Sequence, residues 1–165
     1  MSRDFLNDLN AATPLLTLIA TATIPAIVHY FTKRITTLQT LSAVRSQVAV
    51  ADLEITRLMG VPDKIGEAEL DAIDRNLELR AHVVSLLNIY EELAQATMNK
   101  MIDKRLVKQA RGSMLYATFD RFEPFIMRWR TKENASSAWM NLESLAKSWK
   151  SLTRFTPLPL GSRVV

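Results

Sequence analysis

The residues best suited to chemistry in this chain are carboxylates at helical spacing. They are Glu91, Glu92, Glu123 and Glu143. Paired glutamates from several helices can bridge two metal ions, but such sites also use a Glu-x-x-His repeat on the partner helices. The sequence has no such repeat, so we expect no metal site. Glu91 would more simply form a structural ion pair with a basic residue of the C-terminal third, Arg128 or Arg130.

Two histidines are the remaining candidates for a site. The helical neighbours of His82, Glu78 and Leu86, do not assemble a catalytic triad, so His82 should lie at a boundary or on the surface. His29 lies within an apolar run, where an imidazole can ligate haem or a chlorophyll-type magnesium. It also lies one turn before Lys33, where it can simply reach a membrane interface. We expect no catalytic residue and no cofactor.

His29 belongs to an uncharged run near the N-terminus. No charged side chain occurs between Asp8 and Lys33. The stretch from Pro14 to Thr32 spans roughly 28 Å as a helix, close to a bilayer core of about 30 Å. Thr13 can cap this helix, and proline suits its first position. We therefore predict a membrane-spanning helix over residues 13–32. Its anchoring side chains would be Leu15, Leu16, Leu18, Ile19, Ile24, Ile27, Val28 and Phe31.

The run is only moderately hydrophobic, so a core helix of a soluble domain stays open as an alternative. Threonines, Pro25 and His29 lower its tendency to insert into a bilayer. Ala22 and Ala26 have the small-xxx-small spacing that lets two helices approach closely. We expect the helix to contact another membrane protein or complex in addition to lipid, and a homo-oligomer is a further arrangement.

The flanking charges predict an orientation. Lys33 and Arg34 follow the run, whereas the N-terminal tail over residues 1–12 holds one arginine and two aspartates. Positive residues stay on the cytoplasmic side, and Tyr30 suits the interfacial belt there. We expect a single pass, with the N-terminus outside and the C-terminal domain in the cytoplasm.

Composition favours helices in one folding unit. The chain has four glycines, no cysteine and few aromatic residues. The lack of cysteine excludes disulfides and thiolate chemistry. The net charge of +4 divides into −1 for residues 1–32, +2 for 33–60, −4 for 61–102 and +7 for 103–165. We expect acidic and basic helices to pack together and compensate, although a basic face could also attract anionic lipid or nucleic acid.

Periodicity predicts that the membrane helix continues as a rod to Met59. Its apolar seam would suit packing in a helical domain or a coiled coil. The seam consists of Leu41, Val44, Val48, Ala51, Ile55 and Leu58. Gly60 predicts the end of this helix.

Three further helices are expected. One runs from Glu67 to Met98, and the next begins after Asp103 as N-cap and bends or restarts at Pro124. The last begins near Asn134. The chain is thus predicted to be all-α: one transmembrane helix continues into a bundle of about four helices over residues 33–152, and residues 153–165 form an extended tail.

Short motifs in the second half resemble a bacterial family. They are Leu87–Ala94, Met101–Asp103, Phe122–Ile126, Ala138-Trp139 and Glu143–Ala146. These residues resemble the family catalogued as domain of unknown function 4760, over roughly residues 80–150. The resemblance implies a small helical domain behind one N-terminal helix in the bacterial inner membrane. It implies no reaction, and Asn99-Lys100 stand where the family would have a glycine.

Two function classes follow. The first is a membrane-anchored, non-enzymatic interaction module, an accessory or structural subunit that docks on a larger membrane protein complex. The alternative is a peripheral regulator whose basic C-terminal face binds anionic lipid or nucleic acid. That face would consist of Arg128, Trp129, Arg130, Lys147, Trp149 and Lys150. We expect membrane lipid and a membrane protein as partners, and no nucleic acid.

Overall fold

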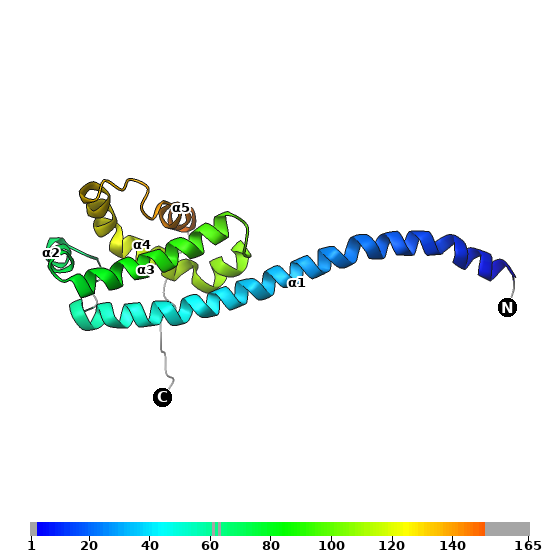
Figure 1. Cartoon of the computed structure of the whole chain (residues 1–165), viewed down its shortest axis with the longest axis horizontal. Helices are drawn as coiled ribbons and strands as arrows, with labels where there is room; N and C mark the ends of the chain where they lie inside the picture. The colour runs from blue at the N-terminus through cyan, green and yellow to red at the C-terminus, as the bar shows by residue number, and fades with distance from the viewer. Residues whose placement is uncertain (1–2, 61, 63, 151–165) are drawn as a thin grey trace, which may run out of the picture.

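The computed structural model describes residues 3–60, 62 and 64–150, with the helical backbone but not the side chains of residues 3–20 and 22. Over these residues the chain forms five α-helices and no strand (Figure 1). They are α1 (Arg3–Met59), α2 (Glu67–Arg75), α3 (Leu77–Met98), α4 (Lys104–Lys132) and α5 (Met140–Trp149). The prediction of an all-α chain is confirmed. The expected tail over residues 153–165 lies outside the described residues.

One long helix organises the molecule. The 57 residues of α1 form one helix that already begins at Arg3, within the expected N-terminal tail. Figure 1 shows that the half ending at Met59 lies along the other helices, while the other half extends beyond them. The expected apolar seam is buried from Leu41 to Ile55 and packs on α3. This face of α1 therefore serves packing within the chain.

The core is built around α3, which packs against α1, α2, α4 and α5. Leu79, Val83, Leu86 and Leu87 of α3 are buried, because apolar residues spaced three and four apart point to the same side of a helix. Large side chains of α4 and α5 complete this core, among them Phe119, Phe122, Phe125, Leu142 and Trp149.

Two of the expected boundaries of helices are confirmed. Gly60 follows α1 with a φ of 80°, which glycine adopts at little cost, and its N–H donates to the carbonyl of Thr56 at 2.8 Å. Asp103 is the N-cap of α4, and its side chain accepts hydrogen bonds from the backbone N–H groups of Arg105 and Leu106. Both residues therefore act through ordinary capping chemistry.

The expected single helix from Glu67 to Met98 is wrong, because the structure divides it into α2 and α3 at Asn76. The Asn76 side chain accepts from the N–H groups of Glu78 and Leu79, at 3.0 and 3.1 Å, and so caps a new helix. An asparagine cap competes with helix continuation at this position. Leu77, the first residue of the new helix, is 76% exposed.

Two further boundaries differ from expectation. Helix α4 continues through Pro124 to Lys132, so the expected alternative of a restart at Pro124 is wrong, while the alternative of a bend stays a prediction. The last helix begins at Met140 and not near Asn134, since Trp139 adopts a left-handed backbone with a φ of 55°. The preceding residues form turns, and Arg130 donates to the Ala138 carbonyl within them.

Candidate interaction site

The outer part of α1 carries large apolar side chains that are exposed in the described chain. They are Ile24, Ile27, Val28, Phe31, Ile35 and Leu38, each 53–58% exposed. Ile24, Val28, Phe31, Ile35 and Leu38 follow steps of four and three, so they form one stripe along the helix. The sequence prediction included this stripe only as far as Phe31. The prediction ended there because Lys33 ends the uncharged run. The apolar spacing of the stripe continues beyond Lys33 with Ile35 and Leu38.

Thr37 marks the point where α1 leaves the domain. Its side chain is fully buried, donates to the Lys33 carbonyl at 2.7 Å and accepts from the Asp103 N–H at 2.8 Å. These bonds join α1 to the turn between α3 and α4. From residue 36 back to residue 21, the described side chains are exposed except for the half-buried Lys33. Residues 21–36 of α1 therefore lie outside the core of the described chain, although Tyr30 and Lys33 line a hollow together with residues of the α3–α4 turn.

The predicted membrane span is placed only in part. The side chains of Leu15, Leu16, Leu18, Ile19 and Ala22 lie outside the described residues. In the portion of the chain that the structure describes, no helix combines the length and the apolar character needed to cross a membrane. The span and the Ala22–Ala26 contact therefore stay predictions. Ala26 itself is exposed.

The predicted interfacial residues lie on the outer part of α1. Tyr30 is 53% exposed, and its hydroxyl accepts a hydrogen bond from Arg34 at 3.2 Å. Lys33 points into a hollow beside the turn between α3 and α4. His29 is exposed on the same helix, and its role as a ligand stays untested.

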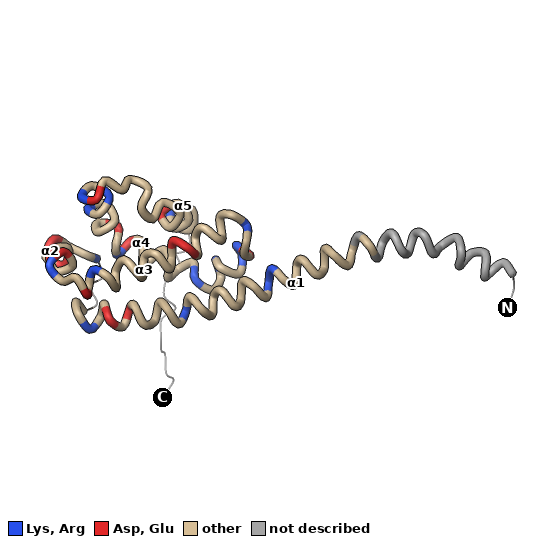
Figure 2. The backbone as a smooth tube through the Cα atoms, in the orientation of Figure 1, with Lys and Arg blue, Asp and Glu red and all other residues tan. Residues whose placement is uncertain are grey.

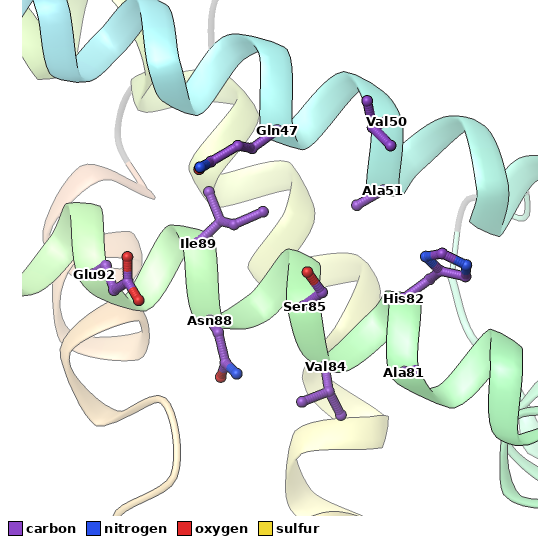
Figure 3. A pocket seen from close by; sticks show the side chains of 10 residues that line it. All are labelled: Gln47, Val50, Ala51, Ala81, His82, Val84, Ser85, Asn88, Ile89 and Glu92. Carbon is purple, nitrogen blue, oxygen red and sulfur yellow. The ribbon is translucent and has the colours of Figure 1, made fainter.

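A groove of about 810 Å³ lies between α1 and α3 (Figure 3). Gln47, Val50 and Ala51 line it from α1, while His82, Ser85 and Ile89 are among the residues that line it from α3. Within the described part of the chain, no hydrogen bond joins Ser85 to His82. The groove is a mixed apolar and polar surface, which suits contact with another molecule better than nucleophilic chemistry.

One cluster beside the groove has metal-ligand types. Ligand atoms of Glu54, Glu78 and His82 lie within 4.8 Å of one another. Arg57 already donates to both carboxylates, at 2.6 Å to Glu54 and 2.8 Å to Glu78. The Glu54 hydrogen bond raises the pKa of Arg57 above its usual value. A second cation here would be repelled by the guanidinium, so the cluster is explained as an ion pair between α1 and α3.

The expected ion pair between Glu91 and Arg128 is absent, because each side chain has other partners. Glu91 accepts hydrogen bonds from Asn141 and from the Leu142 N–H, at the start of α5. Arg128 pairs instead with Glu67, Asp71 and Asp74 of α2. Its hydrogen bond with Asp71 is the main cause of a raised pKa.

The basic face of the alternative function is largely neutralised by pairing. Arg130 and Lys147 both pair with Glu143, and Arg128 is held by the acids of α2. Trp149 is buried, and the Trp129 ring packs against Phe125 and Trp139. These contacts agree with the expectation that acidic and basic helices compensate one another.

Fold and surfaces together define a class: a small all-α domain carried on a single long N-terminal helix, whose described side chains outside the domain include an exposed apolar stripe. The chain belongs to the family described as Domain of unknown function (DUF4760), whose model matches residues 16–149. The match includes part of the outer half of α1 as well as the helical domain. No match was found among curated proteins or among solved structures.

Proposed function

We propose that the chain is a membrane-anchored, non-enzymatic interaction module. One observation carries the proposal: the described outer part of α1 exposes apolar side chains from Ile24 to Leu38, and of these only Leu38 lines a hollow with residues of α4. A monomeric soluble protein rarely exposes a long contiguous apolar stripe. The part of the stripe from Ile24 to Phe31 belongs to the uncharged run that begins at Pro14, so a lipid environment for that run accounts for its exposed apolar side chains.

The proposed topology follows from charge. Lys33 and Arg34 stand between the apolar run and the domain. The positive-inside rule then puts the helical domain in the cytoplasm of a bacterium and the N-terminus outside the inner membrane. The protein would be an accessory or structural subunit of a larger membrane complex, with the α1–α3 groove facing its protein partner.

The proposal includes no chemistry. In the groove, no hydrogen bond joins His82 to the nearby Ser85 hydroxyl among the described residues. The carboxylates of Glu54 and Glu78, which could otherwise bind a metal ion with His82, are paired with Arg57. The peripheral-regulator alternative gains no support, because three of the basic side chains on which it depended, Arg128, Arg130 and Lys147, are paired with carboxylates.

Membrane fractionation of the full-length chain in its native cells tests the proposal. We expect the chain to stay with membranes after carbonate washing and to migrate, after mild detergent extraction, in a complex larger than its own mass. Release by carbonate would contradict the anchor. Migration as a single chain in several mild detergents would contradict the accessory-subunit role.

A further inference from the structure

The end of the domain from which α1 emerges carries a group of basic residues without acidic partners. It comprises Lys33 and Arg34 of α1, Lys100 of the α3–α4 turn, and Lys104 and Arg105 at the start of α4. We call these five residues the basic end. Among the described residues, none of the five forms an ion pair. Figure 2 shows this blue group where α1 leaves the other helices.

Basic residues at the opposite end of the domain are different, although Arg45 of α1 and Lys108 and Arg111 of α4 also form no ion pair among the described residues. At the opposite end, Lys64 pairs with Asp120, Arg75 with Asp71, and Lys132 with Asp74. Positive charge is therefore unpaired at the end from which α1 emerges, whereas these three basic residues of the opposite end are paired with acids. An uncompensated group of this kind attracts anions.

The basic end surrounds a hollow of about 620 Å³. Lys33, Lys100, Lys104 and Arg105 all line it. Asp103 is the one carboxylate among its lining residues, and that carboxylate already accepts the N–H groups of Arg105 and Leu106. The first turn of α4 also directs its positive helix dipole toward this end. The hollow therefore offers several cationic groups to a phosphate.

Apolar side chains accompany these cations. Met101 is 67% exposed and Met98 46% exposed, both at the α3–α4 turn. Beyond Thr37, the exposed stripe of α1 begins at once. Basic residues mixed with exposed apolar side chains suit a lipid interface, whereas nucleic acid would reward the charges but not the methionines.

We propose that the basic end binds the headgroups of anionic phospholipids, with Met101 entering the interface. This rests on the proposed function, because a span by α1 would hold this end of the domain at the membrane surface. Lysine and arginine near an anionic leaflet each strengthen binding by roughly fivefold, so the group can orient the domain on the membrane.

The chain lacks cysteine, so one reporter can be placed cleanly. Met101→Cys, labelled with an environment-sensitive fluorophore, is reconstituted as the full-length chain in vesicles of phosphatidylcholine with or without phosphatidylglycerol. We expect a blue shift only with phosphatidylglycerol, and its loss in salt of roughly 1 M, where the Debye length falls to about 3 Å.

Two triple variants in the reporter background identify the surface. The basic-end variant combines Lys100→Gln, Lys104→Gln and Arg105→Gln. It should require at least roughly tenfold more phosphatidylglycerol for the same shift. The control replaces Lys64, Arg75 and Lys132 with glutamine, which removes the same charge from the opposite end. It should keep the shift of the parent protein. Circular dichroism of both variants confirms that they fold.

The outcomes separate this inference from the anchor. An equal fluorescence shift in neutral and anionic vesicles overturns the inference, and so does a full shift in the basic-end variant. The inference is also overturned if a single-stranded DNA oligonucleotide, added at equal charge, displaces the basic end from anionic vesicles and abolishes the shift. Flotation with neutral vesicles after a carbonate wash reports the anchor separately. A chain that fails this flotation but still shifts with phosphatidylglycerol would disprove the anchor and keep the lipid site.

Discussion

At the scale of single residues, Glu91 connects α3 to the first turn of α5. Its carboxylate accepts from the Asn141 N–H at 3.2 Å, the Asn141 side-chain amide at 2.7 Å and the Leu142 N–H at 2.7 Å. Helix α5 has no cap of its own, because its N-cap residue is Trp139, which makes no side-chain cap hydrogen bond. Glu91 therefore supplies the cap from another helix.

Replacing Glu91 with alanine is expected to destabilise the fold by about 1 to 2 kcal/mol, since the N–H groups at the start of α5 lose their acceptor. The matched control is Glu92→Ala, because Glu92 is exposed and lies next in sequence. It should change stability by less than about 0.5 kcal/mol. Urea denaturation of the full-length variants in detergent, followed by circular dichroism, measures both. Equal destabilisation by the two variants would contradict the capping role.

Glu143 makes stability depend on pH. Its pKa is lowered below the ordinary 4.5, first by its hydrogen bond to Lys147 and then by Arg130. A carboxyl whose folded pKa is depressed contributes stability that is present above the unfolded pKa and is lost as pH falls through the folded pKa. We expect unfolding free energy to fall as pH drops below about 4.5. Glu143→Gln should flatten this part of the profile, and an unchanged slope would disprove the assignment.

Sequence reasoning found these glutamates but not their partners. Glu91 and Asn141 are separated by 50 residues, and Arg128 and Asp71 by 57. Local spacing contains no information on such distant contacts, which depend on how the helices are arranged. The expectation of a structural role for Glu91 agrees with the structure, while the partner named for it does not.

At the scale of helices, Thr37 holds α1 against the turn that begins α4. Its hydroxyl donates to the Lys33 carbonyl and accepts from the Asp103 N–H, so one side chain bonds to both elements. The residue is fully buried. This contact places the basic end beside the start of the outer stripe.

Thr37→Val keeps the shape of the side chain but removes the acceptor of the Asp103 N–H. We expect a loss of about 1 to 3 kcal/mol, since a buried donor is left without a partner, and faster amide hydrogen exchange at Asp103. Thr40→Val is the control, because the Thr40 hydroxyl donates only to the carbonyl of Thr36 in its own helix. Should exchange at Asp103 stay as slow as in the parent protein, Thr37 would not be the connection.

Helix boundaries could be predicted where one residue type decides them. Gly60 and Asp103 have clear capping chemistry, and both predictions are confirmed. Asn76 also has capping chemistry, but the apolar residues before and after Asn76 keep the same helical spacing, which favoured one continuous helix. The left-handed backbone at Trp139 has no local signal, because tryptophan rarely adopts it. Packing of its ring on Phe125 and Trp129, together with a hydrogen bond to Asn88, accompanies this conformation.

At the scale of the molecule, α1 joins two regions of different chemistry. One part packs its seam on α3 and completes the core, and the described outer part exposes an apolar stripe. The basic end lies between them. The seam was predictable because its burial follows from period alone. The lack of ion pairs at the basic end was not predictable, since it depends on which basic residues the fold brings close to acids.

The most direct test of the account compares two pairs of lysine substitutions on the same helix. Ile24→Lys with Val28→Lys changes the outer stripe, and Ala49→Lys with Leu53→Lys changes two exposed apolar residues beside the domain that do not line the α1–α3 groove. Each lysine in a spanning helix costs about 3 kcal/mol. After carbonate washing of native membranes, we expect the first variant in the supernatant and the second, like the parent chain, in the membrane pellet. If the first variant stays in the pellet as the second does, α1 is not the membrane anchor.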